Sequence, residues 1–569
     1  MWRDQGSSAS AGFVSSRFDR IRDRLSFRSC RWAFLRSFTI DPLVPILRAG
    51  AYAAGIALDT HMGEFNAWAQ EMLDPGSSLY RFQPEIAVLA VQARDLAPES
   101  ALERLSDCIA AFRRNSQAAL IVHMLEQPAI PASGVFDAQQ PDGEAEAIRR
   151  INRGLVELAA GHRGVYLLDY DALVARHGRL TWGDERKWLT VRLPISSPNL
   201  PHMAAEWLRF LHPLTGKIAK CVAVDLDNTL WGGVIGEDGM AGIKLGQEYP
   251  GAAFQTVQRA LLDLTRRGIL LAVCSKNNSA DAMEAIAGHP GMILQPRDFA
   301  AMRINWNAKA QSLREIAAEL NIGLDSVALL DDNPVERQQV RDQAPEVIVV
   351  DLPADPMAYG RTIRESPWFE RLALSQEDRR RGEYYAAQRE RSELERSVTS
   401  KEDFYRSLEQ VCRIARVNET TLARVAQLTQ KTNQFNLTTK RYTEQQIAAM
   451  AECPGWRVYS LHVKDRYADN GLVGVAITKQ EDGVCEIDTL LMSCRVIGRT
   501  VETALLAKVA ADAKDNGART LQGRFVPTRK NAPASDFYKD HEFQEVESGL
   551  WSLDLYEKQL QVPDWIKTV

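Results

Sequence analysis

The stretch from Val222 to Leu230 constrains the fold of this chain most strongly, because a buried strand there runs into two carboxylates. Its first residues are apolar, which is typical of a central strand of a parallel sheet. Asp225 and Asp227 follow one residue apart, and Thr229 comes next. Open α/β sheets bind ligands at the carboxyl ends of their strands. Because adjacent carboxylates repel each other, we expect a divalent cation or a proton to neutralise part of their negative charge.

The length of 569 residues exceeds what one hydrophobic core supports, and predicts about three to four domains. Apolar residues make up 45% and charged residues 25%, as in ordinary globular proteins. The net charge of -5 comes without a basic stripe, so we expect no nucleic-acid partner. No apolar run approaches the roughly 18 residues of a membrane span, so we expect no membrane partner.

The cysteines are scattered and form no CxxC pair, which favours reduced thiols over a disulfide or zinc framework. This cysteine usage and the absence of an apolar signal core predict a cytoplasmic protein. The eight cysteines are Cys30, Cys108, Cys221, Cys274, Cys412, Cys453, Cys485 and Cys494.

The hydrophobic patterns predict an α/β multidomain chain. Its expected parts are a tail over residues 1–30, an α/β domain over 31–216, a second α/β domain over 217–360, a charged linker helix over 361–400 and an α+β domain over 401–558. Strands of the first domain are expected at residues 32–35, 49–57, 86–91, 118–125 and 165–169.

The first α/β domain resembles an SGNH-hydrolase sheet, with Ser37 near the position of the nucleophile. That family has an Asp-x-x-His element near the end, where this chain has Asn199-Leu200-Pro201-His202. It also has a Gly-x-Asn turn where this chain has Gln92-Ala93-Arg94-Asp95. Because both partners of the serine are altered, we expect a degenerate scaffold or docking domain rather than an esterase.

Three further polar elements of the second α/β domain are expected at the same edge as Asp225. Ser275 ends one strand, Asp331 and Asp332 end another, and Lys309 opens a helix. Each residue type is common, but this order at strand ends and a helix start is a specific signal.

The series Asp-x-Asp-x-Thr, Ser, Lys and Asp-Asp resembles the motifs of the haloacid dehalogenase (HAD) superfamily. The longer sequence segments at 225–239, 331–334, 430–439 and 488–498 resemble those of the FkbH-like branch, subfamily IIIC. Members of that branch load a glyceryl unit from 1,3-bisphosphoglycerate onto an acyl carrier protein in polyketide and other secondary-metabolite pathways. The resemblance covers roughly residues 30 to 555.

The motif chemistry assigns a role to each residue. Asp225 would attack phosphorus and form an aspartyl phosphate, while Asp227 would protonate the leaving oxygen and later activate water. Thr229, Ser275 and Lys309 would bind the phosphoryl oxygens. Magnesium prefers oxygen ligands, and its expected ligands are Asp225, Asp227 through its backbone carbonyl, Asp332 and Asp331.

The segments around this site leave room only for a minimal cap. A short glycine-rich flap separates Asp227 from the helix near Gln255, and one helix and one strand separate Ser275 from Lys309. Because phosphoryl transfer benefits from the exclusion of water, we expect another domain or a macromolecular substrate to close the site.

The C-terminal domain carries a loop that resembles the acyl-CoA loop of GNAT acyltransferases, through Arg495, Gly498 and Arg499. Thr500 departs from the small residue of that pattern. Cys494 precedes the loop and is a candidate acyl-carrying thiol, with simple packing as the alternative. Asn433 and Asn436 would bind an amide-bearing ligand such as a pantetheine arm, although a helix end followed by a turn explains these amides equally well.

The primary hypothesis is a bifunctional enzyme that transfers a glyceryl unit from 1,3-bisphosphoglycerate to an acyl carrier protein, with dephosphorylation at Asp225. One alternative is a magnesium-dependent phosphatase of small phosphate esters with an inert C-terminal domain. Another makes that domain a CoA-dependent acetyltransferase.

Overall fold

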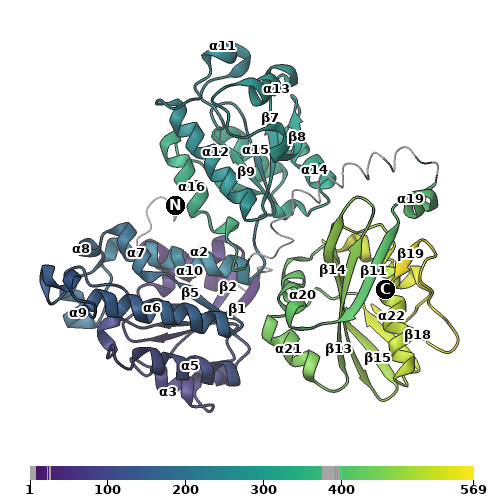
Figure 1. The fold of residues 1–569 in the computed structure, drawn as a ribbon, viewed down its shortest axis with the longest axis horizontal. Helices are drawn as coiled ribbons and strands as arrows, with labels where there is room; N and C mark the ends of the chain where they lie inside the picture. The colour runs from purple at the N-terminus through teal and green to yellow at the C-terminus, as the bar shows by residue number, and fades with distance from the viewer. Residues whose placement is uncertain are drawn as a thin grey trace. The chain divides into compact units, whose positions relative to one another are not determined.

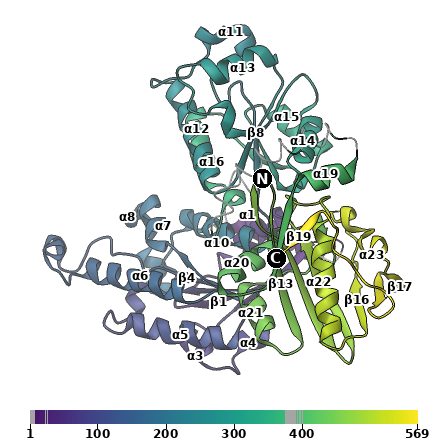
Figure 2. The same ribbon diagram turned by 45° about the vertical axis from the view of Figure 1, so that its right-hand side comes forward.

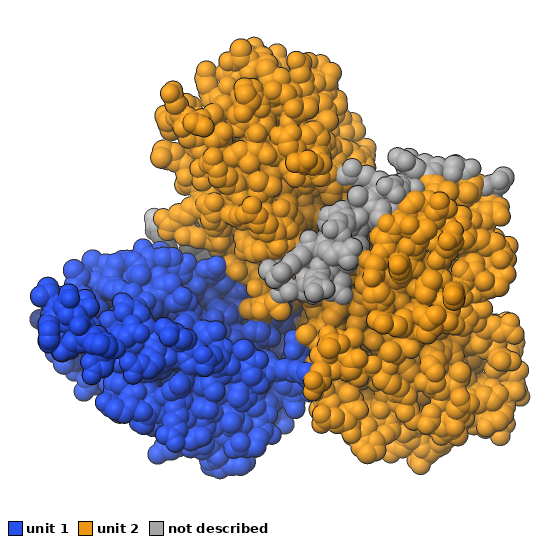
Figure 3. Space-filling view, viewed as in Figure 1, with its two compact units in different colours: residues 1–215, 443–446 blue, residues 216–442, 447–569 orange. Residues whose placement is uncertain are grey.

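The computed structural model describes residues 8–21, 24, 27–373, 391, 394, 398, 400–528 and 530–569. The chain divides into two compact units (Figure 3). Unit 1 comprises residues 1–215 and 443–446, and unit 2 comprises residues 216–442 and 447–569. Of the charged linker helix expected over 361–400, residues 374–399 lie outside the described part of the chain, except for Arg391, Leu394 and Val398.

Unit 1 is built on a five-stranded sheet in which every pairing is parallel. Its order is β2-β1-β3-β4-β5, a doubly wound arrangement that reverses direction between β1 and β3. The strands are β1 (Arg28–Arg36), β2 (Ile56–Met62), β3 (Ile86–Ala90), β4 (Ala119–His123) and β5 (Val165–Leu168). The helices are α1 (Ser8–Ile21), α2 (Val44–Ala53), α3 (Trp68–Leu73), α4 (Ser78–Phe82), α5 (Ala101–Asn115), α6 (Glu144–Gly161), α7 (Tyr170–His177), α8 (Arg179–Trp182), α9 (Glu185–Val191) and α10 (Leu200–Leu214).

Helices cover both faces of this sheet (Figure 1). Ala33 and Leu35 of β1 pack in a core shared with α3, α5 and α6. Phe34 points to the opposite face, where its ring lies 5.0 Å from that of Trp207 on α10. The alternation of buried side chains along β1 therefore builds two cores, one on each side of the sheet.

The prediction of a strand at residues 49–57 is wrong for the first half of that range. Residues up to Ala53 belong to α2, and β2 begins only at Ile56. The segment is rich in alanine, which has the highest helix propensity, and Pro45 fits the first turn of the helix. Gly55, with φ +70°, then breaks the helix and lets the chain turn into the strand.

The first sheet of unit 2 is also wholly parallel, in the order β10-β9-β6-β7-β8. Its strands are β6 (Cys221–Val224), β7 (Leu270–Ser275), β8 (Phe299–Ile304), β9 (Val327–Asp331) and β10 (Ile348–Asp351). The helices around it are α11 (Ile235–Gly242), α12 (Gly251–Arg266), α13 (Ser279–Gly288), α14 (Lys309–Glu319), α15 (Pro334–Gln343) and α16 (Tyr359–Glu365). This parallel α/β sheet is consistent with the expected HAD-like domain, and its order reverses between β9 and β6.

The side chains of β6 alternate between two cores. Val222 and Val224 pack with α12, α13 and α16, whereas Cys221 and Ala223 pack with α14 and α15. The central strand is thus buried on both faces, and only the ends of the strands are open to ligands.

The flap between β6 and α12 is short. It contains α11 and one antiparallel bridge, between Gly232 and Lys244. Gly239 interrupts α11 with φ +65°, a conformation that glycine adopts readily. The flap is an extension of the strand end rather than a folded lid.

The second sheet of unit 2 has the order β17-β18-β16-β15-β14-β13-β11-β19, with β12 beside β15. It is antiparallel except for the β15–β16 and β11–β19 pairs. Its strands are β11 (Gln410–Arg416), β12 (Phe435–Asn436), β13 (Trp456–Lys464), β14 (Asp469–Glu481), β15 (Val484–Met492), β16 (Thr520–Arg524), β17 (Gln544–Glu547), β18 (Leu550–Asp554) and β19 (Ile566–Thr568). Its helices are α19 (Lys401–Ser407), α20 (Glu419–Lys431), α21 (Glu444–Glu452), α22 (Val501–Asp515) and α23 (Phe537–Asp540).

The helices of this α+β part lie on both faces of its sheet. Figure 2 shows α22 on one side of the strands and α20 and α21 on the other. The core with α22 includes Tyr459 and Leu461, and the core with α20 includes Val458. Among the described residues, no helix combines the length and apolar character that crossing a membrane requires.

Candidate active site

The carboxyl ends of β6 and β9 meet where the strand order reverses. Asp225 directly follows β6, and its backbone N–H donates to the carbonyl of Leu330 on β9 at 2.9 Å. Asp331 ends β9, and Asp332 follows it. The parallel register therefore brings three carboxylates together, as the sequence predicts.

Lys309 is the cation at the centre of this cluster. It begins α14 and is only 4% exposed. Its Nζ lies 2.8 Å from Asp225 Oδ2 and 2.5 Å from Asp331 Oδ2. Burial lowers the pKa of Lys309, but the two carboxylates raise it more, so the ammonium form is favoured. Burial and the Asp225 charge together raise the pKa of Asp331.

The remaining charge fits a divalent cation. Carboxylate oxygens of Asp225, Asp331 and Asp332 lie within 4.8 Å of one another. Lys309 supplies one positive charge to balance the three negative charges of these carboxylates. Asp331 is engaged by Lys309 and by the backbone N–H of Asn333 at 2.9 Å. The side chains best placed to hold magnesium are therefore those of Asp225 and Asp332.

Thr229 supports Asp332. The threonine is fully buried, and its hydroxyl donates to Asp332 Oδ1 at 3.2 Å. The same hydroxyl accepts from the Asp332 N–H at 3.2 Å. In the structure Thr229 thus positions a candidate metal ligand, instead of facing open space where a phosphoryl group could bind.

Asp227 turns away from the metal cluster into a pocket of donors. Its Oδ1 accepts from Trp231 Nε1 at 2.8 Å and from the backbone N–H of Ile235 at 3.1 Å. Its Oδ2 accepts from Asn277 Nδ2 at 2.8 Å. Burial, followed by the Asp225 charge, raises the pKa of Asp227 above its usual range despite these bonds. A raised pKa suits a carboxyl group that must both give and take a proton.

Trp231 and Asn277 are site residues that the sequence analysis missed. Asn277 stands two residues after Ser275, at the end of β7, so its place beside a predicted strand end was the available signal. Ser275 itself is buried beside this edge, and its hydroxyl makes no hydrogen bond to any other described residue. Its role in binding a phosphoryl group stays a prediction.

Cys494 lies in a small hollow of unit 2. This hollow has a volume of about 50 Å³. Its lining is polar and cationic, and includes Lys220, Arg424, Lys431, Asn433, Cys494 and Arg495. The structure thus brings together three of the residues predicted for the C-terminal domain: Cys494, Arg495 and Asn433. Lys220 precedes β6 and Ser326 precedes β9, so this hollow lies at the amino ends of the strands whose carboxyl ends carry Asp225 and Asp331.

Two residues expected to bind pantetheine serve the fold instead. Arg499 is 4% exposed, and its Nη1 lies 2.9 Å from Asp465 Oδ2 inside the domain. Asn436 is fully buried, and its Oδ1 accepts the Thr439 N–H at 2.9 Å. Gly498, with φ +78°, shapes the loop before α22. The reason for both corrections is the same: the loop backbones turn these side chains inward to satisfy buried polar groups.

Ser37 in unit 1 has no catalytic base beside it among the described residues. It is 2% exposed, donates to Asp95 Oδ2 at 2.6 Å and accepts from the Gln92 N–H at 3.0 Å. The ring of His202 stacks on that of His177 at 3.9 Å, and no described imidazole bonds to Ser37. The serine, base and carboxylate of a hydrolase are therefore not assembled there.

Residues 42–212 match the model of the FkbH N-terminal domain. The chain is also similar to the crystal structure of the N-terminal part of protein BF1531 from Bacteroides fragilis, which contains a phosphatase domain and is complexed with Mg. That similarity has 26% identity and a TM-score of 0.58, and covers 65% of this chain and 100% of the other.

Two acetyltransferase structures match part of the chain, each at a TM-score of 0.21. The ribosomal-protein-S18-alanine N-acetyltransferase of Escherichia coli is 14% identical over 27% of this chain and 97% of its own. An acetyltransferase of the GNAT family from Staphylococcus aureus Mu50 is 12% identical over 25% and 99%. No curated protein matches the chain. The comparisons thus connect the chain to the FkbH N-terminal domain and to a magnesium-bound phosphatase-domain protein.

Proposed function

We propose that the Asp225 cluster is a magnesium-dependent phosphatase site that works through an aspartyl phosphate. The observation that carries this proposal is the meeting of Asp225, Lys309 and Asp332 at adjoining strand ends. The similarity to a phosphatase-domain protein complexed with Mg supports it. Asp225, Asp332 and the backbone carbonyl of Asp227 would hold the ion, which would neutralise charge on the transferring phosphoryl group.

The reaction proceeds in two displacements. A carboxylate oxygen of Asp225 attacks phosphorus, the bond to the leaving oxygen breaks, and Asp227 gives that oxygen a proton. The Asp227 carboxylate then takes a proton from water, whose oxygen attacks the same phosphorus. Inorganic phosphate leaves, and Asp225 and the protonated Asp227 are restored. Lys309 and Ser275 stabilise the phosphoryl oxygens in both steps.

We further propose that Cys494 carries an acyl group. The cationic side chains around it favour an anionic substrate, as an acyl phosphate such as 1,3-bisphosphoglycerate would be. The thiolate attacks the acyl carbon, a C–S bond forms, and the C–O bond to the departing phosphate breaks.

The acyl group then passes to the phosphopantetheine thiol of an acyl carrier protein. The pantetheine thiolate attacks the thioester carbon, and Cys494 leaves as a thiolate. Asn433 and Arg495 line the hollow and would contact the arm. In this proposal the mostly antiparallel sheet of unit 2 is a GNAT-like scaffold, and the parallel sheet of unit 1 is an SGNH-like scaffold without its triad.

Intact-mass spectrometry tests the proposal in one mixture. The full chain, Mg²⁺, 1,3-bisphosphoglycerate and a holo carrier protein should give a carrier that is heavier by one glyceryl unit. Cys494→Ala should abolish this product, whereas Cys453→Ala, a change at an exposed cysteine of the same unit, should leave it. Phosphate release without any adduct would instead support a simple phosphatase, and an adduct that survives Cys494→Ala would remove that thiol from the mechanism.

A further inference from the structure

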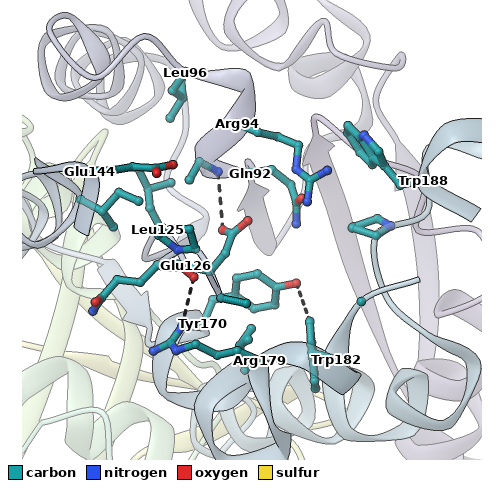
Figure 4. A pocket seen from close by; sticks show the side chains of 18 of the residues that line it. Gln92, Arg94, Leu96, Leu125, Glu126, Glu144, Tyr170, Arg179, Trp182 and Trp188 are labelled. Carbon is teal, nitrogen blue, oxygen red and sulfur yellow. Dashed lines mark hydrogen bonds between the residues drawn. The ribbon is translucent and has the colours of Figure 1, made fainter. Parts of the chain in front are cut away.

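Unit 1 contains a cavity that neither proposed reaction uses. Its volume is about 600 Å³, within the range of small-molecule sites. Gln92 follows β3, Glu126 follows β4 and Tyr170 follows β5, so the cavity opens at the carboxyl ends of three parallel strands (Figure 4). Open α/β sheets bind their ligands at this edge. Ser37 does not line it.

One buried hydrogen-bond acceptor in this cavity lacks a donor, and a half-buried carboxyl group beside it has only a weak one. Gln92 is 2% exposed, and its Oε1 is buried without a partner among the described residues. The Glu126 carboxyl group lies in the middle of the view in Figure 4, and the one hydrogen bond that it accepts from another described residue is long, 3.5 Å from the Ala93 N–H. Buried acceptors are normally satisfied in folded proteins. A ligand with N–H or O–H groups would satisfy Gln92 Oε1 and would also donate to the half-buried Glu126.

The other deep polar groups are already paired. Trp182 Nε1 donates to the Tyr170 hydroxyl at 2.8 Å. Arg179 donates to Asp171 at 2.6 and 2.9 Å and to the carbonyl of Gln127 at 3.2 Å. The donors Trp182 and Arg179 therefore already have acceptors within the protein.

Arg94 offers the complementary charge. Its guanidinium carbon lies 4.4 Å from the centroid of the Trp188 ring, which holds the side chain at the cavity (Figure 4). It forms no ion pair within 4.0 Å with any described carboxylate. A stacked guanidinium of this kind suits a ligand carboxylate, which it can bind through two parallel N–H bonds.

We propose that this cavity binds a small carboxylic acid that has an apolar body and hydroxyl or amide donors at its far end. Arg94 binds the carboxylate, and Gln92 and Glu126 accept from the donors. The apolar body packs against a wall that includes Leu96, Leu125, Ile148, Ile151, Val174 and Trp182.

Pantothenate is a suitable probe, because it combines a carboxylate, an amide, two hydroxyls and a branched apolar centre. Panthenol is the matched control ligand, because a hydroxymethyl group replaces the carboxylate of pantothenate. In isothermal titration calorimetry with the full chain, pantothenate should bind at least about tenfold more tightly than panthenol. Arg94→Gln should remove that preference. Gln92→Met should lower the affinity for both ligands several-fold.

Arg153→Gln changes an exposed arginine on α6 outside the cavity, and should leave both affinities unchanged. Phosphate release at the Asp225 site should also be unchanged in the Arg94 and Gln92 variants, which separates this proposal from the phosphatase proposal. The proposal is overturned if correctly folded wild-type protein binds neither probe, or if Arg94→Gln and Gln92→Met both bind like the wild type. A preference for panthenol would overturn the role of Arg94.

Discussion

Lys220 and Asp225 lie at opposite ends of strand β6. Lys220 lines the hollow of Cys494 at the amino end, and Asp225 carries the phosphatase cluster at the carboxyl end. At about 3.3 Å per residue, the strand separates the two positions by about 16 Å. Because an acyl group on Cys494 cannot bridge that span, a phosphate on it must be removed before loading or after transfer to a mobile arm.

The donors around Asp227 should control its proton transfer. Trp231→Phe removes the 2.8 Å bond to Oδ1 and keeps most of the ring packing. Because this bond lowers the pKa of Asp227, its loss should raise that pKa further. We expect the limb of the pH–rate profile that reports Asp227 to move to higher pH, with kcat reduced about tenfold or more. Trp306→Phe, at an exposed tryptophan of the same unit, is the control, and an unchanged profile in Trp231→Phe would exclude this role.

Lys309 should be essential for the stability of the magnesium-free protein. Lys309→Met leaves Asp225 and Asp331 buried without their shared cation, at a cost of about 3–5 kcal/mol. Added Mg²⁺ would neutralise part of that charge, so it should stabilise the variant more than the wild type. Thermal unfolding with and without Mg²⁺ measures both effects. The absence of any stabilisation of either protein by Mg²⁺ would argue against a cation at this cluster.

The strand-end positions of these residues could be predicted, but their pairings could not. The positions of Asp225 and Asp331 follow from the sequence because parallel strands end at one edge of a sheet. The sequence does not show that Lys309 engages Asp331 or that Thr229 supports Asp332, since those contacts depend on rotamers in a packed site. Likewise, the surroundings of Cys494 depend on how two sheets of unit 2 pack. Local sequence patterns do not predict that packing.

Arg495 and Arg499 should respond differently to the same substitution. Arg499 pairs with the fully buried carboxylate of Asp465, together with Arg391. Arg499→Met should therefore destabilise the protein by about 3 kcal/mol. Arg495→Met, at the hollow of Cys494, should leave stability within about 0.5 kcal/mol and slow acyl transfer. Urea unfolding and the carrier-loading rate separate the two effects, and an Arg499 variant of wild-type stability would contradict the buried role.

Glu126 should make unit 1 less stable at alkaline pH. Burial raises the pKa of its carboxyl group from 4.5 to about 7. The folded state therefore binds the proton more tightly than the unfolded state. The stabilisation is complete below pH 4.5 and is lost as the pH rises to about 7, which amounts to about 3 kcal/mol.

Glu126→Gln avoids burying that charge, so its free energy of unfolding should exceed that of the wild type at pH 8 and match it near pH 4. Urea unfolding at several pH values measures the difference, with Glu157→Gln at an exposed position of α6 as the control. A constant difference between Glu126→Gln and wild type at every pH would contradict the raised pKa.

The separation of the two sites gives the most direct test of the whole account. Asp225→Asn should block dephosphorylation and leave Cys494 able to attack the acyl phosphate of 1,3-bisphosphoglycerate. Intact-mass spectrometry of this variant, after mixing with the bisphosphate and Mg²⁺, should show the protein heavier by one phosphoglyceryl unit. The adduct should be absent from the Asp225→Asn, Cys494→Ala double variant. Continued release of phosphate from the phosphoglyceryl ester by Asp225→Asn, or an adduct that remains in the double variant, would contradict the account.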